Sequence, residues 1–133
     1  MLKKLKSLFE KKDRFAKLLG FGIVDIEDGY AKVEVQIQDE YLNGADVIHG
    51  GFLFSLADYA FAIASNSKNN LSLSINSNII FHKAISSGKI HAVAQEIRDG
   101  KNVASYEVKI YDEEKNILAT FIGTVFRKNI KLV

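Results

Sequence analysis

The stretch IHGGFLFSLADYAFAIASNS, from Ile48 to Ser67, places one carboxylate, that of Asp58, inside an otherwise apolar run. Proteins avoid burying an unpaired carboxylate because removing its water is costly, so such a group is normally paired or used. From the residues alone three interpretations are open: a carboxylate at a solvent-facing helix edge, a structural ion-pair partner, or a functional group. Residue type does not decide among them, since perturbed carboxylates occur in structural networks as well as in active sites.

A histidine and two glycines, His49, Gly50 and Gly51, lie at the start of this run. Glycine permits unusual backbone angles and lets a ligand approach the main chain closely, although a Gly-Gly pair alone also fits a simple bend. Free N–H groups at a helix N-terminus, with the positive end of the helix dipole, stabilise an oxyanion. Because Asp58 follows in the same helix, we expect it to lie within reach of a substrate group held at the helix start.

The element that must position these groups is a helix over about residues 51–65. Apolar side chains are distributed around all sides of it, and a helix that is apolar all round is typically buried. These side chains are Phe52, Leu53, Phe54, Leu56, Ala57, Ala60, Phe61, Ala62, Ile63 and Ala64. We therefore predict a central helix enclosed by the rest of the fold.

Strand patterns flank this helix on both sides in the sequence. Before it, residues 33–38 alternate between apolar and polar side chains, which predicts a half-buried strand, and Asp28-Gly29 is a hairpin turn signal. After it come four more strand-like runs, which are residues 71–82, 89–98, 102–111 and 117–127. The connections are short and polar, so we expect consecutive strands to pair antiparallel. The predicted fold is α+β, an antiparallel sheet wrapped around one central helix, in a single domain over residues 1–133.

The N-terminal segment predicts an amphipathic helix over residues 1–19. Leucine and phenylalanine recur there near helical spacing, and Gly20 and Gly22 follow. Residues 1–17 contain seven Lys or Arg side chains against two acidic ones. We favour a surface helix whose apolar stripe lies on the body of the protein, and the alternative is a helix that binds a membrane surface or a partner.

Composition excludes several function classes. The other 116 residues carry 14 acidic and 11 basic side chains, which does not suggest a nucleic-acid-binding surface. The chain has no cysteine, so disulfides and thiolate metal sites are excluded. The basic start lacks the apolar core and cleavage site of a signal peptide, and no window reaches the roughly 18 apolar residues of a membrane span. We expect a cytoplasmic protein.

Taken together, the segment NGADVIHGGFLFSLADYAFAIASNS, residues 43–67, resembles the PaaI-like hotdog thioesterases of the phenylacetic acid degradation type. The resemblance rests on Asn43 six residues before His49, on the glycine pair, and on the SLAD that ends at Asp58. It continues through residues 74–128, whose strand order and turn positions look like those of the family. It therefore covers about residues 22–128, the predicted hotdog core.

This resemblance implies a hotdog fold, dimers formed through the sheet that often pair into tetramers, and acyl-coenzyme A thioester substrates bound near a subunit interface. The N–H of Gly50 would polarise the thioester carbonyl, and Gly51 would support the turn. Asp58, contributed from the partner subunit, would act as general base on water or as nucleophile, while Asn43 and His49 would orient substrate or water. No metal and no cofactor are implied, because coenzyme A is part of the substrate.

Four further residues are candidate substrate contacts, although side chains of these types more often have a purely structural role. Tyr59 and Phe61 either line an acyl pocket or belong to the core. Lys83 and Lys89 lie near turns and either meet the phosphates of coenzyme A or are ordinary surface charge.

We predict an acyl-CoA thioesterase that hydrolyses an acyl- or aryl-acyl-CoA to free acid and coenzyme A. The alternative is a non-catalytic hotdog module that binds acyl-CoA as a regulatory ligand. A hydratase is a weaker alternative, because the proline-rich motif around the histidine is absent. The acyl group, the choice between coenzyme A and acyl-carrier protein, and the choice between dimer and tetramer stay open.

Overall fold

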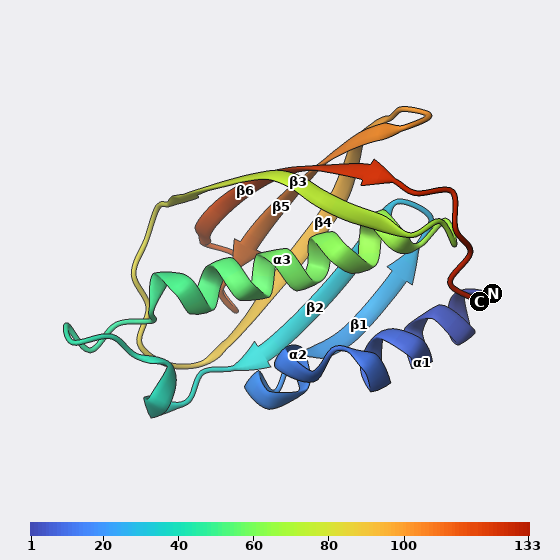
Figure 1. Ribbon diagram of the computed structural model, residues 1–133. Coiled ribbons are helices and arrows are strands. Elements are labelled where there is room, and N and C mark those ends of the chain that lie inside the picture. Colours follow the sequence, from blue (N-terminus) through green and yellow to red (C-terminus); the bar gives the residue numbers. More distant parts are fainter.

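The structure, a computed structural model, describes residues 1–133 and shows a six-stranded antiparallel sheet curved around one long helix (Figure 1). The helices are α1 (Leu2–Lys12), α2 (Arg14–Leu19) and α3 (Gly50–Asn66), and a short 3-10 turn spans Asp39–Tyr41. The strands are β1 (Gly22–Glu27), β2 (Tyr30–Gln36), β3 (Ser72–Phe81), β4 (Lys89–Asp99), β5 (Val103–Tyr111) and β6 (Ile117–Arg127). The predicted α+β fold, with a central helix and an N-terminal helical segment, is confirmed.

The strand order is β1-β2-β4-β5-β6-β3, and this corrects one prediction. The pairs β1–β2, β4–β5 and β5–β6 are antiparallel neighbours as expected, but β3 pairs with β6 and β4 pairs with β2. Residues 82–88 are therefore not a hairpin turn. They form an extended connection past the start of α3 (Figure 1), where the backbone N–H of Ile48 donates to the carbonyl of Ile85 at 2.7 Å.

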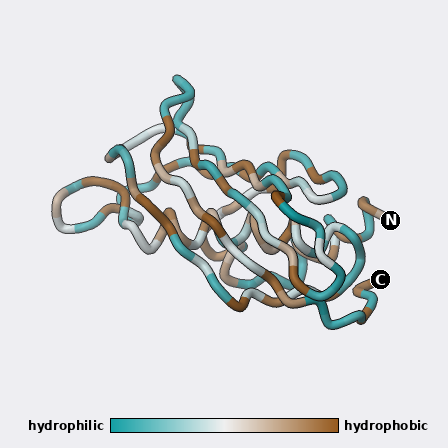
Figure 2. Tube along the Cα trace, turned by 90° about the horizontal axis from the view of Figure 1, so that it is seen from above, coloured by the Kyte–Doolittle hydropathy of each residue, from teal (hydrophilic) through white to brown (hydrophobic).

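The core lies between α3 and the concave face of the sheet. Along β2, β4, β5 and β6 buried residues alternate with more exposed ones, and Figure 2 shows hydrophobic and hydrophilic positions interspersed along the trace. Phe61 of α3 is 1% exposed and packs directly over Gly123 of β6. A Cβ atom at Gly123 would lie 2.6 Å from the Phe61 ring, so only glycine lets the helix approach this closely.

The prediction that α3 is enclosed on all sides is wrong for one stripe. Gly51 and Asp58 are exposed, and Ser55 and Ala62 are only partly buried. These four positions are three or four residues apart, so they lie on one face of the helix, opposite the face that packs on the sheet. The sequence pattern hides this stripe because Gly51 and Ala62 are small residues that fit a buried position as well as an exposed one.

The N-terminal segment is two helices rather than one. Asp13 ends α1 and caps α2, since its Oδ1 accepts a hydrogen bond from the N–H of Ala16 at 3.0 Å. Gly20 ends α2 with a φ of +78°, the left-handed conformation that favours glycine. Leu5 and Ala16 are buried, so the segment lies on the body of the protein as predicted. None of the helices combines the length and the apolar character needed to cross a membrane.

Candidate active site

The start of α3 presents one uncommitted backbone donor. His49 is the N-cap, and its Nδ1 accepts a hydrogen bond from the N–H of Gly51 at 2.9 Å. The N–H groups of Phe52 and Leu53 donate to the carbonyl of His49. The N–H of Gly50 has no acceptor among the turn, loop and capping hydrogen bonds. It is therefore available to an oxyanion at the positive end of the helix dipole.

Gly50 lines a hollow of about 310 Å³ together with Asn43 and Lys83. Phe81, at the end of β3, forms its aromatic wall, and a Cβ atom at Gly50 would lie 3.1 Å from that ring. His82 also lines the hollow, and its Nε2 is 2.9 Å from the hydroxyl of Thr120. The structure thus brings together three of the predicted site residues, which come from the loop before α3, from α3 and from the connection after β3.

Asn43 holds the loop that leads into α3. Its Oδ1 accepts hydrogen bonds from the N–H groups of Ala45 at 2.8 Å and Val47 at 3.3 Å, and its own N–H donates to the carbonyl of Val47. The amide Nδ2 makes no hydrogen bond within the chain. A side chain fixed through one end, with free donors at the other, is suited to orienting a ligand.

Asp58 lies on the open stripe of α3, in a hollow of about 230 Å³ that also contains Asp13, Phe15 and Tyr59. The side chain is exposed in the single chain, as in the interpretation of a carboxylate at a solvent-facing helix edge. No salt bridge or hydrogen bond is formed by this carboxylate, so the ion-pair interpretation is not supported. Partial desolvation by the surrounding groups raises the pKa of Asp58, and the negative charge of Asp13 raises it further.

Within one chain, Asp58 and the free N–H of Gly50 are far apart. They are separated by eight residues of helix, which corresponds to about 12 Å along the axis. Each lines a different hollow. The expectation that Asp58 reaches a group held at the start of its own helix is therefore wrong for a single chain, and a thioester bound at Gly50 needs a carboxylate from elsewhere.

Of the remaining predicted contacts, two line a hollow beside α3 and two belong to the core or to the sheet. Tyr59 lines the Asp58 hollow, and burial raises the pKa of its hydroxyl to about 12. Gly51 lines a third hollow of about 380 Å³ beside His49. Phe61 lies in the core and lines neither the Gly50 hollow nor the Asp58 hollow. Lys89 lies at the start of β4, where its Nζ is 3.8 Å from Glu34, and it does not line the Gly50 hollow.

Several residues at these hollows were not found from the sequence, among them Asp13, Phe15, Phe21, Tyr41, Ser55 and Phe81. The sequence did contain a signal for Asp13, because aspartate is a preferred N-cap residue and could have marked a break in the N-terminal helix. To predict Phe81, one had to know that the end of β3 lies beside the start of α3. The wrong strand pairing did not show this. Nothing in the sequence placed Phe15 against Asp58.

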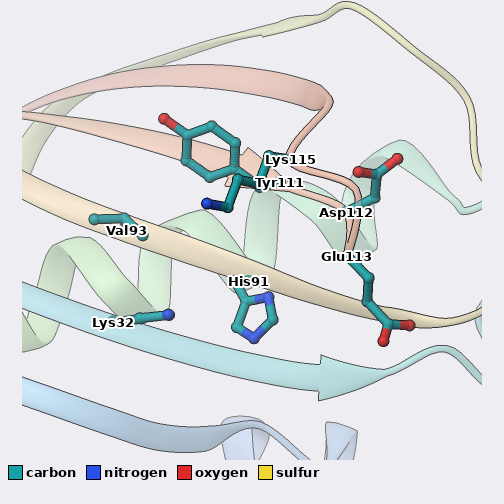
Figure 3. Close-up of a pocket in the computed structure, with 7 residues that line it drawn as sticks. All are labelled: Lys32, His91, Val93, Tyr111, Asp112, Glu113 and Lys115. Atoms are coloured by element: carbon teal, nitrogen blue, oxygen red, sulfur yellow. The ribbon is translucent and has the colours of Figure 1, made fainter.

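Another hollow, of about 390 Å³, opens on the outer face of the sheet and is lined by Lys32, His91, Tyr111 and their neighbours (Figure 3). Its acidic groups are already engaged within the fold. The Asp112 carboxylate accepts hydrogen bonds within its own turn, and Glu113 accepts the N–H of Lys89 at 3.1 Å. It contains none of the predicted catalytic groups, so the α3 hollows are the better candidate for chemistry.

Comparison with known proteins decides the family. The family model described as the thioesterase superfamily matches residues 45–119, which include His49, Gly50, Gly51 and Asp58. This chain belongs to the thioesterase superfamily. The matched region contains α3 and most of the sheet, so the predicted hotdog thioesterase family is confirmed.

Individual relatives agree with this assignment. The chain is 35% identical over 116 residues to the acyl-coenzyme A thioesterase PaaI of Escherichia coli, covering 86% of this chain and 83% of that protein. The solved structure of E. coli PaaI superposes with a TM-score of 0.91 at 30% identity, covering 98% of this chain and 99% of that one. The thioesterase-superfamily chain is thus PaaI-like in both sequence and fold.

Two other relatives also match most of this chain. A protein of Archaeoglobus fulgidus, named only provisionally as an esterase, is 41% identical over 130 residues, covering 97% of this chain and 84% of that protein. The 1,4-dihydroxy-2-naphthoyl-CoA hydrolase of Listeria monocytogenes is 30% identical over 105 residues, covering 75% of this chain and 84% of that protein. Two named relatives of this PaaI-like chain are thus thioesterases that act on coenzyme A esters.

Proposed function

We propose that this PaaI-like protein is an acyl-CoA thioesterase that hydrolyses an acyl- or aryl-acyl-CoA to a free acid and coenzyme A. The observation that carries the proposal is that α3 has both a free backbone donor at Gly50 and an unpaired carboxylate at Asp58, in a chain that belongs to the thioesterase superfamily. A thioester needs a donor for its carbonyl oxygen and a group that activates water, and this fold offers both.

In the proposed reaction, the Gly50 N–H binds the oxygen that becomes negative as the carbonyl carbon is attacked. Asp58 either removes a proton from the attacking water or attacks the carbonyl itself, forming an anhydride that water then hydrolyses. In both routes the C–S bond breaks and the thiol leaves with a proton. Desolvation and the charge of Asp13 raise the pKa of Asp58, which makes it a stronger base than an ordinary carboxylate.

His49 and Asn43 are proposed as positioning groups. Because the Nδ1 of His49 accepts the Gly51 N–H, the ring carries its proton on Nε2 when it is neutral. That Nε2–H is a donor beside the helix start. The free amide donors of Asn43 lie in the same hollow as Gly50, where they can fix the substrate or the water.

The approximately 12 Å between Gly50 and Asp58 within one helix supports a site shared by two chains. β3 is an edge strand, and Leu73, Ile75, Ile80 and Phe81 along it are more than half exposed. An open apolar edge strand favours pairing with another chain. Two β3 edges paired about a two-fold axis would set two α3 helices antiparallel, since α3 runs alongside β3 (Figure 1). The start of one helix would then approach Asp58 of the partner subunit.

The coenzyme A portion is proposed to leave the site past Lys83, the one predicted lysine that lines the Gly50 hollow. A mobile cation beside that hollow suits the phosphates of coenzyme A. Coenzyme A is part of the substrate in this scheme, and the protein groups need no added cofactor. A cytoplasmic location and a dimer or tetramer stay predictions.

The test is an assay of thiol release from a panel of short, long and aryl acyl-CoA thioesters, with Asp58→Asn beside the parental protein. We expect hydrolysis of at least one acyl class and a loss of about 100-fold or more in the variant, because general-base groups typically contribute that much. Equal rates for the two proteins would show that Asp58 is not the base. Tight acyl-CoA binding without thiol release would favour the regulatory binding module instead.

A further inference from the structure

A groove follows the open stripe of α3 beneath α2. One part of it is the hollow of about 230 Å³ that contains Asp58. The other part is the hollow of about 380 Å³ near the helix start, which is lined by Tyr41 and His49. The two hollows share two residues, Phe15 of α2 and Ser55 of α3. Phe15 therefore forms the border between them.

The walls of this groove combine aromatic rings, which suit a hydrocarbon group, with the carboxylates of Asp13 and Asp58 on one side of Phe15 and Glu40 on the other. Around Asp58 the aromatic side chains are Phe21, Phe54 and Tyr59, with the Phe21 and Tyr59 rings 5.8 Å apart. Beyond Phe15, the rings of Tyr41 and Phe52 stack at 4.3 Å. Such apolar walls favour burial of apolar groups of a ligand.

The one polar side chain shared by the two hollows is already satisfied. The hydroxyl of Ser55 donates to the carbonyl of Gly51 at 2.8 Å, inside its own helix. It therefore does not need a ligand as a hydrogen-bond acceptor. An acyl chain lying over Ser55 would cover little unsatisfied polar surface.

Phe15 is held over this groove by its helix, although little of the fold covers it. It is 58% exposed, and α2 is fixed by the Asp13 cap at one end and by Gly20 at the other. Leu18 on the same helix is also apolar and is 76% exposed, but it lines neither hollow. Phe15 and Leu18 are thus both exposed apolar residues of α2, but Phe15 borders the groove and Leu18 does not.

We propose that the acyl group of the substrate occupies the Asp58 hollow and that the Phe15 ring limits its length. A short or compact acyl group fits on the Asp58 side of the ring. A longer chain has to displace Phe15 to enter the second hollow, toward Tyr41 and Phe52. This inference rests on the proposed function, because it places the acyl part of the same thioester.

The test compares Phe15→Ala and Phe15→Trp with the parental protein, and Leu18→Ala is the matched control. Binding of two S-alkyl coenzyme A thioethers, butyl and decyl, is measured by calorimetry, because thioethers are not hydrolysed. Hydrolysis of butanoyl-CoA and decanoyl-CoA is measured in parallel. Both substituted positions are exposed, so the variants are expected to fold.

We expect Phe15→Ala to raise the preference for decyl over butyl by about 10-fold, the scale on which an apolar pocket distinguishes chain lengths. Phe15→Trp should lower that preference, and Leu18→Ala should leave it unchanged. If the binding preference of Phe15→Ala and Phe15→Trp equals that of the Leu18→Ala control, the inference is overturned. A protein that binds with the expected preferences but hydrolyses neither ester would contradict the proposed function and leave the role of Phe15 standing.

Discussion

The two ends of α3 differ in how completely their polar groups are satisfied. At the C-terminal end, Asn66 exchanges hydrogen bonds with Ser72, accepting its N–H at 2.8 Å and donating to its carbonyl at 3.2 Å. The Ser67 hydroxyl accepts the N–H of Gly29 at 2.8 Å and donates to the carbonyl of Ala64 at 2.7 Å. In the N-terminal half, which runs from Gly50 to Asp58 at the middle of the helix, the N–H of Gly50 and the carboxylate of Asp58 have no partner within the chain.

Charged side chains are also paired near the C-terminal end of α3 and unpaired around Asp58. Lys68, just beyond α3, lies 3.2 Å from Asp28, 3.2 Å from Asp99 and 3.5 Å from Glu96. The nearly buried Arg127 pairs with Asp99 and Glu96. Around Asp58, by contrast, the nearest charge with an effect on its pKa is another carboxylate, Asp13. The C-terminal end of the helix, the closed end, ties strands together, and the N-terminal half up to Asp58, the open end, leaves reactive groups accessible to a ligand.

Function and stability therefore depend on different parts of α3. Groups with complete partners fix the position of α3, and groups without partners are free to bind substrate. Changes at the open end should therefore affect turnover more than stability. Changes at the closed end should do the reverse.

We expect the largest effect, a loss of turnover, from replacing Gly50. It is the first residue of α3, where proline is well tolerated, and His49 already has the extended backbone that a residue before proline requires. Gly50→Pro removes the N–H and should lower kcat by about 100-fold or more, the typical contribution of one oxyanion donor. The matched control is Gly50→Ala, which adds a Cβ beside Phe81 and keeps the N–H. Equal kcat values for the two variants would contradict the oxyanion role.

At the closed end, Arg127→Ala should destabilise the fold by about 3 kcal/mol, because it removes the buried cation beside Tyr106 and leaves Glu96 with Lys68 as its one cation. Urea unfolding measures this. Lys109→Ala, which breaks an exposed ion pair with Glu107 on the same strand, β5, is the control and should cost about 0.5 kcal/mol. A similar cost for the two variants would show that the Arg127 cluster does not fix the closed end.

The same cluster predicts an acid sensitivity. The hydrogen bond from Arg127, followed by that from Lys68, holds the pKa of Asp99 below its usual value. A carboxyl with a lowered folded-state pKa contributes stability above its unfolded pKa, and that stability is lost as pH falls toward the folded value. Asp99→Asn should therefore reduce stability at neutral pH, with the difference shrinking in acid. Melting temperatures at a series of pH values check this, and a difference that does not change with pH would contradict it.

A smaller effect is expected from Asp13, which together with desolvation raises the pKa of Asp58. Asp13, the N-cap of α2, and Tyr59 of α3 are the other titratable groups in that hollow. Asp13→Asn keeps a good N-cap and removes the charge, so the acid limb of kcat/KM should move to lower pH. Glu10→Gln, on α1, is the control and should leave the limb in place. A limb that moves equally in both variants would rule out a specific effect of Asp13.

The smallest expected effect is the change in fold stability when Asp58 is replaced by asparagine. Its folded-state pKa is raised, so ionisation weakens the fold as pH rises through the window between the unfolded and folded pKa values. Asp58→Asn removes that penalty and should melt at the parental temperature or slightly above it at neutral pH. Below the unfolded pKa the difference should vanish. A clear loss of stability would mean that Asp58 has a structural role.

Much of this arrangement could be predicted from local sequence patterns. The period-two runs, the Asp28-Gly29 turn and the apolar α3 gave the strands and the central helix, and the family resemblance located Gly50 and Asp58. The partner of β3 could not be predicted, because strand pairing depends on contacts between residues distant in sequence. The open stripe of α3 was missed because a helical pattern of small residues does not say which side is covered. The role of Phe15 depends on the packing of α2 over α3.

Complementation between two inactive variants tests whether each active site is shared between two chains. Gly50→Pro and Asp58→Asn chains would be co-expressed with different affinity tags, and the mixed oligomer isolated through both tags. If each site combines Gly50 of one chain with Asp58 of its partner, one of the two sites in a mixed pair is intact. We predict roughly half of the parental activity per mixed pair in a two-fold symmetric dimer. Activity no higher than that of either variant alone would contradict a site shared between chains.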